Sequence, residues 1–434
     1  MAKGTKQELR NYTFYQVYNR NHNESGTFIE LIEDLERIKS LGTDVLYLLP
    51  IHTIGKKDKK GELGCPYSIE NYREINPEYG TLEDFKKLIE ATHACGMKIM
   101  IDVVYNHTSR DSHLLATHPE WFYKNEAGEF ANRVGDWSDI TDFDYTSSKA
   151  LWAELIDTLV YWASLGIDGF RCDVAPLVTL DFWLEARKAV NAINEDFIWL
   201  AESVEPSFIE LLRHAGFDAL SDSQTFDAFD ICYDYDVYGA YRDYLKGKGE
   251  LETYIQLLQQ QEYIFPKNYV KLRNLENHDQ PRVASLISTP EQLFMWTAFN
   301  FFQRGAAMIY AGQEAMDTNL PSLFDIDKVN WSRYNECGLV DYMTALIKLK
   351  KDSIMANANY SIKLSDEIKD VVILTHEDNE TKRIGIFNFG LRQGEISLDV
   401  LDGTYTQLID NTPVVVANQK VALTTRAILI DIKK

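Results

Sequence analysis

The sequence predicts an α/β fold: a closed barrel of eight parallel strands with a small insert, followed by an antiparallel β-sandwich. Strand-like and helix-like patterns alternate from about residue 12 to 350, which is typical of a parallel sheet with crossover helices. Several strand-like runs are apolar throughout, as strands buried on both faces should be. Four of them end in charged groups, and the (β/α)8 (TIM) barrel gathers its active-site residues at the carboxyl ends of its strands.

The elements follow one another in regular order along the first 350 residues. Thr27 with Glu30, and Thr81 with Asp84, have the spacing of helix-opening capping residues, and Gly96 can close the second of these helices. The expected strands cover residues 15–18, 45–49, 98–104, 169–174, 197–201, 218–221, 270–279 and 306–311. The expected helices cover residues 27–41, 81–96, 148–165, 181–192, 206–214, 238–263, 290–303 and 341–351.

Two segments depart from this alternation. Residues 108–147 are too long for a plain loop after the third strand and are rich in Trp, Phe, His, Asn and Asp, so we expect an inserted subdomain over the barrel mouth. The barrel then covers residues 1–107 and 148–354. Short strands with turn residues between them, such as Asp402-Gly403, predict a separate C-terminal sandwich over residues 355–434.

Composition excludes some classes of partner. The net charge is −22, from 44 basic and 66 acidic residues, and repels phosphate backbones and anionic lipid, so we expect neither nucleic acid nor a membrane as partner. The N-terminus lacks the apolar stretch of a signal peptide, and the chain has no run of 18 apolar residues. The five cysteines are scattered, as free thiols of a reducing compartment are. We therefore expect a cytoplasmic protein, without a prediction of its oligomeric state.

The charged strand ends indicate the chemistry. Asp173, Glu202 and Asp279 follow three of the strands, and hydrolysis of a glycosidic bond needs one carboxylic acid and, in a retaining enzyme, a second carboxylate as nucleophile. Arg171 lies two residues before Asp173, so it points to the same face of a strand and should keep Asp173 ionised. Nearby negative charges should raise the pKa of Glu202, as a general acid requires.

These strand ends also carry a resemblance. The segments DVVYNH (102–107), GFRCDVA (169–175), WLAES (199–203) and ENHD (276–279) are similar, in order and spacing, to the strand-end motifs of the α-amylase family of retaining glycoside hydrolases. Further similar segments are CPYSIENYREINPEYGT (65–81) and GAAMIYAGQE (305–314). The resemblance extends over the whole chain, including the insert and the C-terminal sandwich.

The resemblance implies a role for each residue of these motifs. Asp173 is implied to be the nucleophile, Glu202 the general acid and then base, and Asp279 the third carboxylate, which grips hydroxyl groups of the sugar. The implied substrate-binding residues are Tyr67, which would stack on the sugar, and His107, Arg171, His278 and Arg282. Asp102 is implied to orient Arg171. We expect Trp121, Phe122 and Trp137 to belong to the core of the insert.

The sequence departs from the family pattern in two places. The Lys-His pair that many α-amylases carry after the nucleophile is replaced by Ala175-Pro176-Leu177, and Val174 resembles members that act on α-1,6 bonds. Asn106 matches a frequent calcium ligand, but six or more oxygen ligands are not evident around it. We therefore expect no required cofactor, with calcium left as a weaker alternative.

The sequence thus predicts a retaining hydrolase of α-1,4-linked malto-oligosaccharides, with α-1,6 bonds as a further linkage. In such an enzyme the carboxyl groups of Asp173 and Glu202 should lie about 5–5.5 Å apart. One alternative is a transglycosylase or a glucosyl isomerase of the trehalose- or isomaltulose-synthase kind on the same scaffold. Others are a catalytically dead binding module and a metal-dependent hydrolase that uses His107 and His278 as ligands.

Overall fold

The computed structural model describes residues 4–287 and 289–434, and a closed barrel of eight parallel strands lies at its centre. Each strand pairs with the next along the chain, and β1 pairs with both β2 and β12, which closes the barrel. The predicted barrel is confirmed. Its strands are β1 (Thr13–Val17), β2 (Val45–Leu48), β5 (Lys98–Val103), β8 (Gly169–Cys172), β9 (Ile198–Ala201), β10 (Ile231–Tyr233), β11 (Lys271–Arg273) and β12 (Ala306–Tyr310).

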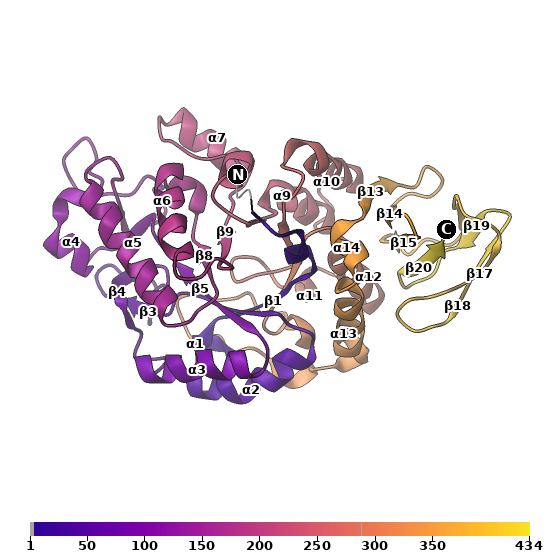
Figure 1. The fold of residues 1–434 in the computed structure, drawn as a ribbon, viewed down its shortest axis with the longest axis horizontal. Coiled ribbons are helices and arrows are strands. Elements are labelled where there is room, and N and C mark those ends of the chain that lie inside the picture. Colours follow the sequence, from indigo (N-terminus) through magenta and orange to yellow (C-terminus); the bar gives the residue numbers. More distant parts are fainter. Residues whose placement is uncertain (1–3, 288) are drawn as a thin grey trace.

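Helices connect the strands, and most lie where the sequence pattern predicts them. The Thr27 hydroxyl accepts a hydrogen bond from the Glu30 N–H, and Thr81 forms a complete capping box with Asp84. In Figure 1, α2 and α3 run side by side along the lower edge of the barrel. The helices are α1 (Asn19–His22), α2 (Phe28–Ser40), α3 (Leu82–Ala94), α4 (His113–Thr117), α5 (Lys149–Ser164), α6 (Leu180–Asn191), α7 (Pro206–His214), α8 (Asp222–Thr225), α9 (Tyr235–Leu245), α10 (Leu251–Ile264), α11 (Val283–Leu286), α12 (Pro290–Phe302), α13 (Leu339–Lys350) and α14 (Ser353–Asn357).

The sixth barrel strand lies elsewhere than predicted. Residues 218–221 are not a strand, and Ser221 instead caps α8 through a capping box with Gln224. The strand is the three-residue run Ile231–Tyr233, which is completely buried. This run is too short to give a periodic signal, and acidic residues stand on both sides of it in the sequence, so the pattern hid it.

Two small hairpins lie over the barrel mouth. The insert is tied to the barrel by β6 (His107–Ser109), which pairs antiparallel with β7 (Ile140–Asp142) at its far end. A second hairpin, β3 (His52–Ile54) and β4 (Ile69–Ile75), follows the second barrel strand and was not predicted. Both hairpins lie near one another, because β4 contacts β6. The segments that these hairpins carry form the walls of the cleft described below.

The C-terminal part consists of two four-stranded antiparallel sheets, as the predicted sandwich requires. One sheet has the order β13-β14-β15-β20 and the other β16-β19-β18-β17. A small apolar core, which includes Val371, Ile384 and Ile396, fills the space between them. The strands are β13 (Asn359–Leu364), β14 (Val371–Glu377), β15 (Thr381–Asn388), β16 (Glu395–Ser397), β17 (Gly403–Thr406), β18 (Pro413–Ala417), β19 (Lys420–Ala422) and β20 (Ile428–Lys433).

Helix α12 joins the barrel to this sandwich. All ten residues from Leu293 to Phe302 are buried, because the helix has the barrel on one side and the first C-terminal sheet on the other. Trp296 stacks on Phe389 with ring centroids 3.9 Å apart, and the His376 ring hydrogen-bonds the carbonyl of Phe302 at 2.8 Å. Figure 1 shows the two C-terminal sheets beyond α12, at the right-hand end of the molecule.

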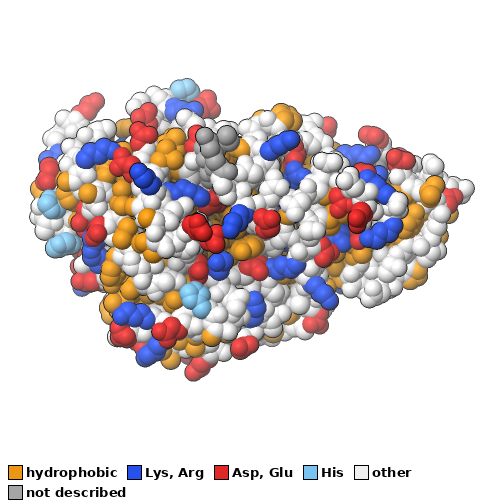
Figure 2. Space-filling view, viewed as in Figure 1, with side chains coloured by type: hydrophobic (Ala, Val, Ile, Leu, Met, Phe, Trp, Pro, Cys, Tyr) orange, Lys and Arg blue, Asp and Glu red, His pale blue; other side chains and the backbone are white. Residues whose placement is uncertain are grey.

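No helix among the described residues combines the length and the apolar character needed to cross a bilayer. On the face seen in Figure 2, acidic and basic side chains are interspersed over the barrel and the C-terminal lobe.

Candidate active site

The predicted strand-end residues meet at the carboxyl end of the barrel. Asp173 follows β8, Glu202 follows β9, and Asp279 lies in the loop after β11. These are the fourth, fifth and seventh barrel strands. The three carboxylates line a cleft of about 360 Å³ together with Tyr67 and His107. This volume is near the lower end of the range of ligand pockets, about 300–1,000 Å³.

A single guanidinium, that of Arg171, contacts the carboxylates of Asp102, Asp173 and Glu202. Arg171 is completely buried, and its Nη1 donates hydrogen bonds to Asp102 at 2.8 Å and to Asp173 at 2.9 Å. Its Nη2 lies 2.8 Å from Oε1 of Glu202, an ion-pair contact without the alignment of a hydrogen bond. Asp173 and Glu202 are therefore neighbours on the two terminal nitrogens of one side chain. Asp102 lies where the predicted orienting residue should be.

Val174, directly after Asp173, has an unusual backbone conformation. Its φ of 35° and ψ of 46° lie in the left-handed region, which β-branched residues rarely adopt. In this conformation its N–H donates a hydrogen bond of 2.7 Å to Oε2 of Glu202. A strained residue at such a place persists only when its surroundings hold it. The turn after β8 thus positions the carboxylate that follows β9.

His278 is held by residues from two other parts of the barrel end. The amide nitrogen of Gln16, on β1, lies 3.1 Å from Nδ1, and the Tyr67 hydroxyl lies 2.7 Å from Nε2. The Tyr67 hydroxyl also donates to Asp102 at 2.9 Å, and its ring stacks on the imidazole. Nε2 of His278 is 3.0 Å from Asp279. These contacts hold the imidazole with Nε2 toward Tyr67 and Asp279 and Nδ1 toward Gln16.

Burial dominates the titration of the carboxylates around Arg171. It raises the pKa of Asp173 to about 7, although the charge of Arg171 opposes the shift. It likewise raises the pKa of Glu202 to about 7, with Arg171 opposing and the charges of Asp173 and Asp279 adding to the rise. Burial also raises the pKa of Asp102, to about 6. Arg171 thus acts on Asp173 in the expected direction, but desolvation outweighs this one cation, which three carboxylates share.

The pKa values of Asp279 and His107 are lowered instead. Burial works to raise the pKa of Asp279, but the charge and hydrogen bond of His278 outweigh it and hold that pKa below its usual value. The Asp279 side chain is 38% exposed and opens into the cleft. Burial lowers the pKa of His107, so its imidazole is neutral at neutral pH. Asp279 is thus the ionised carboxylate of the set.

Arg282 is not brought into the cleft. Its guanidinium is buried, donates to Glu276 at 2.8 Å and to the Ala311 carbonyl at 2.9 Å, and lies over the Tyr310 ring. The position of Arg282 therefore does not support the predicted contact with the sugar of the cleaved subsite. The reason is Glu276, a buried carboxylate in the same loop, which takes this cation as its partner.

Several cleft residues escaped the sequence reasoning. Gln16, Tyr47 and Tyr233 support His278, Asp102 and one another from inward positions of β1, β2 and β10, which the alternation of a strand could have indicated. The sequence analysis gave none of the other lining residues a role in substrate binding or catalysis. These are Lys60, Cys65, Asp139, Ile140, Val174, Leu323 and Phe324. Trp137 also lines the cleft, against its expected place in the core of the insert, and its ring packs against His107 and Phe208.

The surroundings of Asn106 do not fit a calcium ion. The carboxylate of Asp142 accepts hydrogen bonds from the backbone N–H and the guanidinium of Arg133, at 2.8 and 3.2 Å. A second nitrogen of this guanidinium donates to the Phe143 carbonyl at 3.0 Å. The Asn106 amide nitrogen faces the same carboxylate at 3.4 Å. Arg133 therefore supplies the positive charge there, and the described residues include no cluster of three or more His, Cys, Asp or Glu that could hold a metal.

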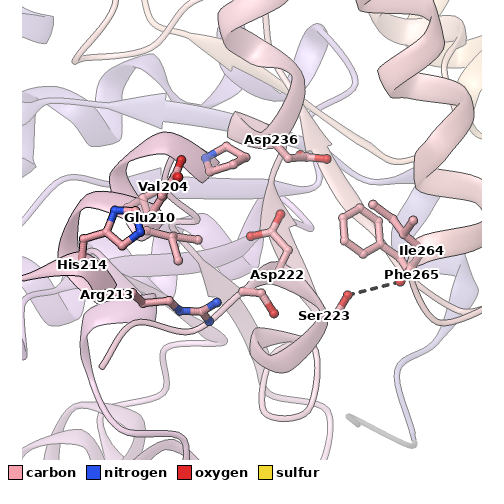
Figure 3. A pocket seen from close by; sticks show the side chains of 12 residues that line it. Val204, Glu210, Arg213, His214, Asp222, Ser223, Asp236, Ile264 and Phe265 are labelled. Atoms are coloured by element: carbon pink, nitrogen blue, oxygen red, sulfur yellow. Dashed lines mark hydrogen bonds between the residues drawn. The ribbon is translucent and has the colours of Figure 1, made fainter. Parts of the chain in front are cut away.

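A second cavity, of about 420 Å³, lies beside α7 and is drawn in Figure 3. Val204, Ile209 and Phe265 give it largely apolar walls, and Asp222 and Asp236 point toward it. Buried Lys271 forms ion pairs with both carboxylates. Asp222 and Asp236 are thus held by a structural cation, and the cleft at Asp173 remains the better candidate for catalysis.

The chain is similar to known glycoside hydrolases along nearly its whole length. A family model described as alpha amylase, catalytic domain, matches residues 14–118 and 116–379, and one described as bacterial alpha amylase C-terminal domain matches residues 363–430. The crystal structure of an alpha-amylase from Lactobacillus plantarum is 44% identical, with a TM-score of 0.95, over 98% of this chain and 100% of that one. A noncanonic maltogenic alpha-amylase from Thermotoga neapolitana is 31% identical, with a TM-score of 0.88, over 98% and 100% of the two chains.

Curated relatives are more distant and longer. An alpha-1,4-glucan:maltose-1-phosphate maltosyltransferase from Myxococcus xanthus is 26% identical over 59% of this chain and 39% of its own length. The chain spans less than two thirds of the length of this relative and of the others that head the comparison.

Proposed function

The chain belongs to the alpha-amylase family and is a glycosidase, and from this we propose that it cleaves α-1,4 bonds of malto-oligosaccharides with retention of configuration. The observation that carries the proposal is the arrangement of Asp173 and Glu202 on the two terminal nitrogens of Arg171. Retaining enzymes need a nucleophilic carboxylate close to an acid, whereas inverting enzymes leave room for a water between the two.

In the first step, Glu202 protonates the glycosidic oxygen while Asp173 attacks the anomeric carbon of the sugar. The bond from that carbon to the leaving oxygen breaks, the new bond to Asp173 forms, and the leaving sugar departs as an alcohol. Arg171 and Asp279 surround a transition state in which positive charge develops on the sugar ring. In the second step, Glu202 takes a proton from water, which displaces Asp173 and restores both groups.

The proton that this cycle requires has a defined place. Asp173 and Glu202 both titrate near pH 7, so near neutrality the pair holds about one proton. Arg171 hydrogen-bonds Asp173 with good alignment but meets Glu202 without it. The proposed cycle requires the anion on Asp173, which the aligned hydrogen bond from Arg171 favours, and the proton on Glu202.

The remaining polar groups would bind the sugar. Asp279, ionised and open to the cleft, accepts hydrogen bonds from hydroxyls of the sugar that becomes attached to Asp173. His107 and His278 line or support the same side, and Tyr67 offers an aromatic ring beside them. An oligosaccharide is thus the proposed partner, and α-1,6 bonds are the second linkage to be tried.

We also propose that the enzyme works without calcium, since Arg133 already neutralises Asp142. Its proposed location is the cytoplasm, which is supported by the five cysteines, all free of disulfides.

Transfer of the sugar to another sugar is the second candidate function. It uses the same covalent intermediate on Asp173 but replaces water by a hydroxyl, and some relatives of the chain are maltosyltransferases. Products longer than the substrate, formed from maltotriose, would identify transfer.

The test is sugar release from maltose, maltotriose, isomaltose, pullulan and starch. We expect activity on the α-1,4-linked substrates, and we expect Asp173→Ala to reduce it to background while circular dichroism shows an intact fold. Near-normal turnover in that variant would exclude the proposed nucleophile.

A further inference from the structure

One side of the cleft is closed by three segments that are bonded to one another. The first is the loop over residues 55–65, between β3 and β4; the second is residues 136–140 of the insert; the third is residues 322–325, after β12. The Leu63 N–H donates to the Phe324 carbonyl at 3.1 Å, and the Glu62 N–H donates to Asp325 at 2.8 Å. Lys60 donates to the Asp136 carbonyl at 3.1 Å and lies 3.2 Å from Asp139. We call these three joined segments the cleft wall.

The cleft wall is fixed from below by a buried arginine. Arg20, on α1, is 4% exposed and donates to the carbonyls of Gly64 at 3.0 Å and Leu323 at 3.1 Å, so one guanidinium joins two of the three segments. Gly61 permits their close approach, because a Cβ at this residue would lie 2.5 Å from the Cβ of Phe324. Its φ of +64° likewise favours glycine. The contact is therefore built into the fold and does not depend on surface side chains alone.

The chemistry of the site tells which end of a sugar chain meets the cleft wall. The sugar attached to Asp173 lies against Asp279 and His278, and the leaving sugar lies on the side of Glu202, which protonates it. Tyr67 follows the 55–65 segment directly and stacks on His278. The cleft wall therefore stands on the side of the attached sugar, toward the non-reducing end of the substrate.

The opposite side of the cleft has a different character. Val174 lies there beside Glu202, in a small apolar cluster that Phe208 joins, and Trp137, from the insert end of the cleft wall, packs against the same cluster. This surface suits the apolar faces of leaving sugars. The cleft is thus asymmetric, with a bonded barrier on the side of the attached sugar and an apolar surface on the side of the leaving group.

From this asymmetry, and resting on the proposed function, we propose that the enzyme attacks α-glucan chains only from their non-reducing ends. Lys60, Leu323 and Phe324 line the cleft at the barrier and determine this specificity. Asp173 and these three residues line one cleft of about 360 Å³, so the space between Asp173 and the barrier is smaller than this volume. The enzyme therefore releases glucose or maltose and does not cut within a chain.

The experiment compares two forms of p-nitrophenyl maltoheptaoside, one with a free non-reducing end and one with that end blocked by a 4,6-O-ethylidene group. Products are separated by chromatography. We expect the blocked form to be cleaved slower by roughly 100-fold or more, because its terminal group cannot occupy the closed end. Similar rates on both forms would overturn the proposal. Failure to cleave either form would instead refute the proposed function.

Variants test whether the cleft wall is the cause. Lys60→Ala combined with Phe324→Ala should raise cleavage of the blocked substrate by roughly tenfold or more relative to the free one. Leu320→Ala is the control, since this side chain lies two residues before the third segment and is 70% exposed to solvent, and it should change neither rate. A folded double variant that still rejects the blocked substrate as the wild type does would contradict the role of these residues.

Discussion

The backbone N–H of Val174 donates a hydrogen bond of 2.7 Å to the Glu202 carboxylate, and it does so from a left-handed conformation. The residue after the proposed nucleophile thus orients the proposed acid, in an arrangement that links two barrel strands. A β-branched residue in this conformation costs roughly 1–2 kcal/mol. This strain is a measurable property of the site.

Replacement of Val174 by Gly and by Ala should reveal the strain. Both variants lose the buried isopropyl group, but only Gly adopts the left-handed conformation without a steric penalty. We expect Val174→Gly to be more stable than Val174→Ala by about 1 kcal/mol, which reverses the usual order for a regular element. Urea denaturation of the two variants measures the difference. A more stable Ala variant would show that the backbone at Val174 is not strained.

Loss of the proposed acid should depend on the leaving group. Glu202→Gln removes the proton donor and should lower turnover of maltotriose by about 10²–10⁴-fold. With α-maltosyl fluoride, whose leaving group needs no proton, formation of the intermediate should be far less affected. Asp173→Ala is the matched control and should abolish activity on both substrates. Equal losses for Glu202→Gln on the two substrates would argue against its role as acid.

The activity should have a maximum close to neutral pH. Below this range Asp173 gains a proton and cannot attack, and above it Glu202 loses the proton that it must donate, since the pKa of each lies at about 7. A pH profile of kcat/KM should therefore fall on both sides of neutrality. A profile that stays flat from pH 5 to 9 would contradict the shared proton.

The same burial makes Asp173 a source of instability at high pH. Its pKa is about 7 in the folded protein against about 3.9 in an unfolded chain, so the stability it contributes is full below pH 4 and is lost as pH rises through 7. Asp173→Asn does not titrate. Its stability relative to the wild type should thus increase by about 1–3 kcal/mol between pH 5 and pH 8, at about 1.4 kcal/mol per pKa unit.

Denaturation at the two pH values measures this effect. Asp181→Asn, at an exposed position of α6, removes the same charge from the surface and serves as the control. A gain for Asp173→Asn that is no larger at pH 8 than at pH 5 would contradict the prediction.

Arg133 should replace a metal in holding the insert. Arg133→Ala leaves Asp142, which is 1% exposed, without its cation and should cost about 3–5 kcal/mol of stability. Arg110→Ala, which removes a more exposed arginine of the insert, should cost much less. Thermal denaturation compares them. Treatment of the wild type with a calcium chelator should leave its activity unchanged, and inactivation that calcium reverses would refute the calcium-free proposal.

The sequence predicted those features that depend on buried charge. Asp173 and Glu202 end apolar strands, and a charge at such a place needs a shared site, so their convergence followed from the pattern. The three-residue strand at Ile231–Tyr233 gave no such signal, because its own residues are apolar and the run is too short for an alternation pattern to stand out.

Other features depend on tertiary partners that no local pattern encodes. Arg282 looked like a sugar ligand until the structure paired it with Glu276. Lys60 and Phe324 stand far apart in the sequence and line one cleft because their segments are hydrogen-bonded to each other and to Arg20. Likewise, the charge of Arg171 indicated an ionised Asp173, but the opposing effect of desolvation depends on how deeply the fold buries the carboxylate.

The ten consecutive buried residues of α12 set a limit on how this protein can be divided. Without the C-terminal sheets, the rings of Trp296, Phe299 and Phe302 would lose their contacts with Phe387 and Phe389 and become a more exposed apolar stripe. A barrel expressed alone would therefore be prone to aggregate, and the two lobes should melt in a single cooperative transition. Exchange of the C-terminal lobe between relatives would succeed only where the aromatic contacts of this helix are exchanged with it.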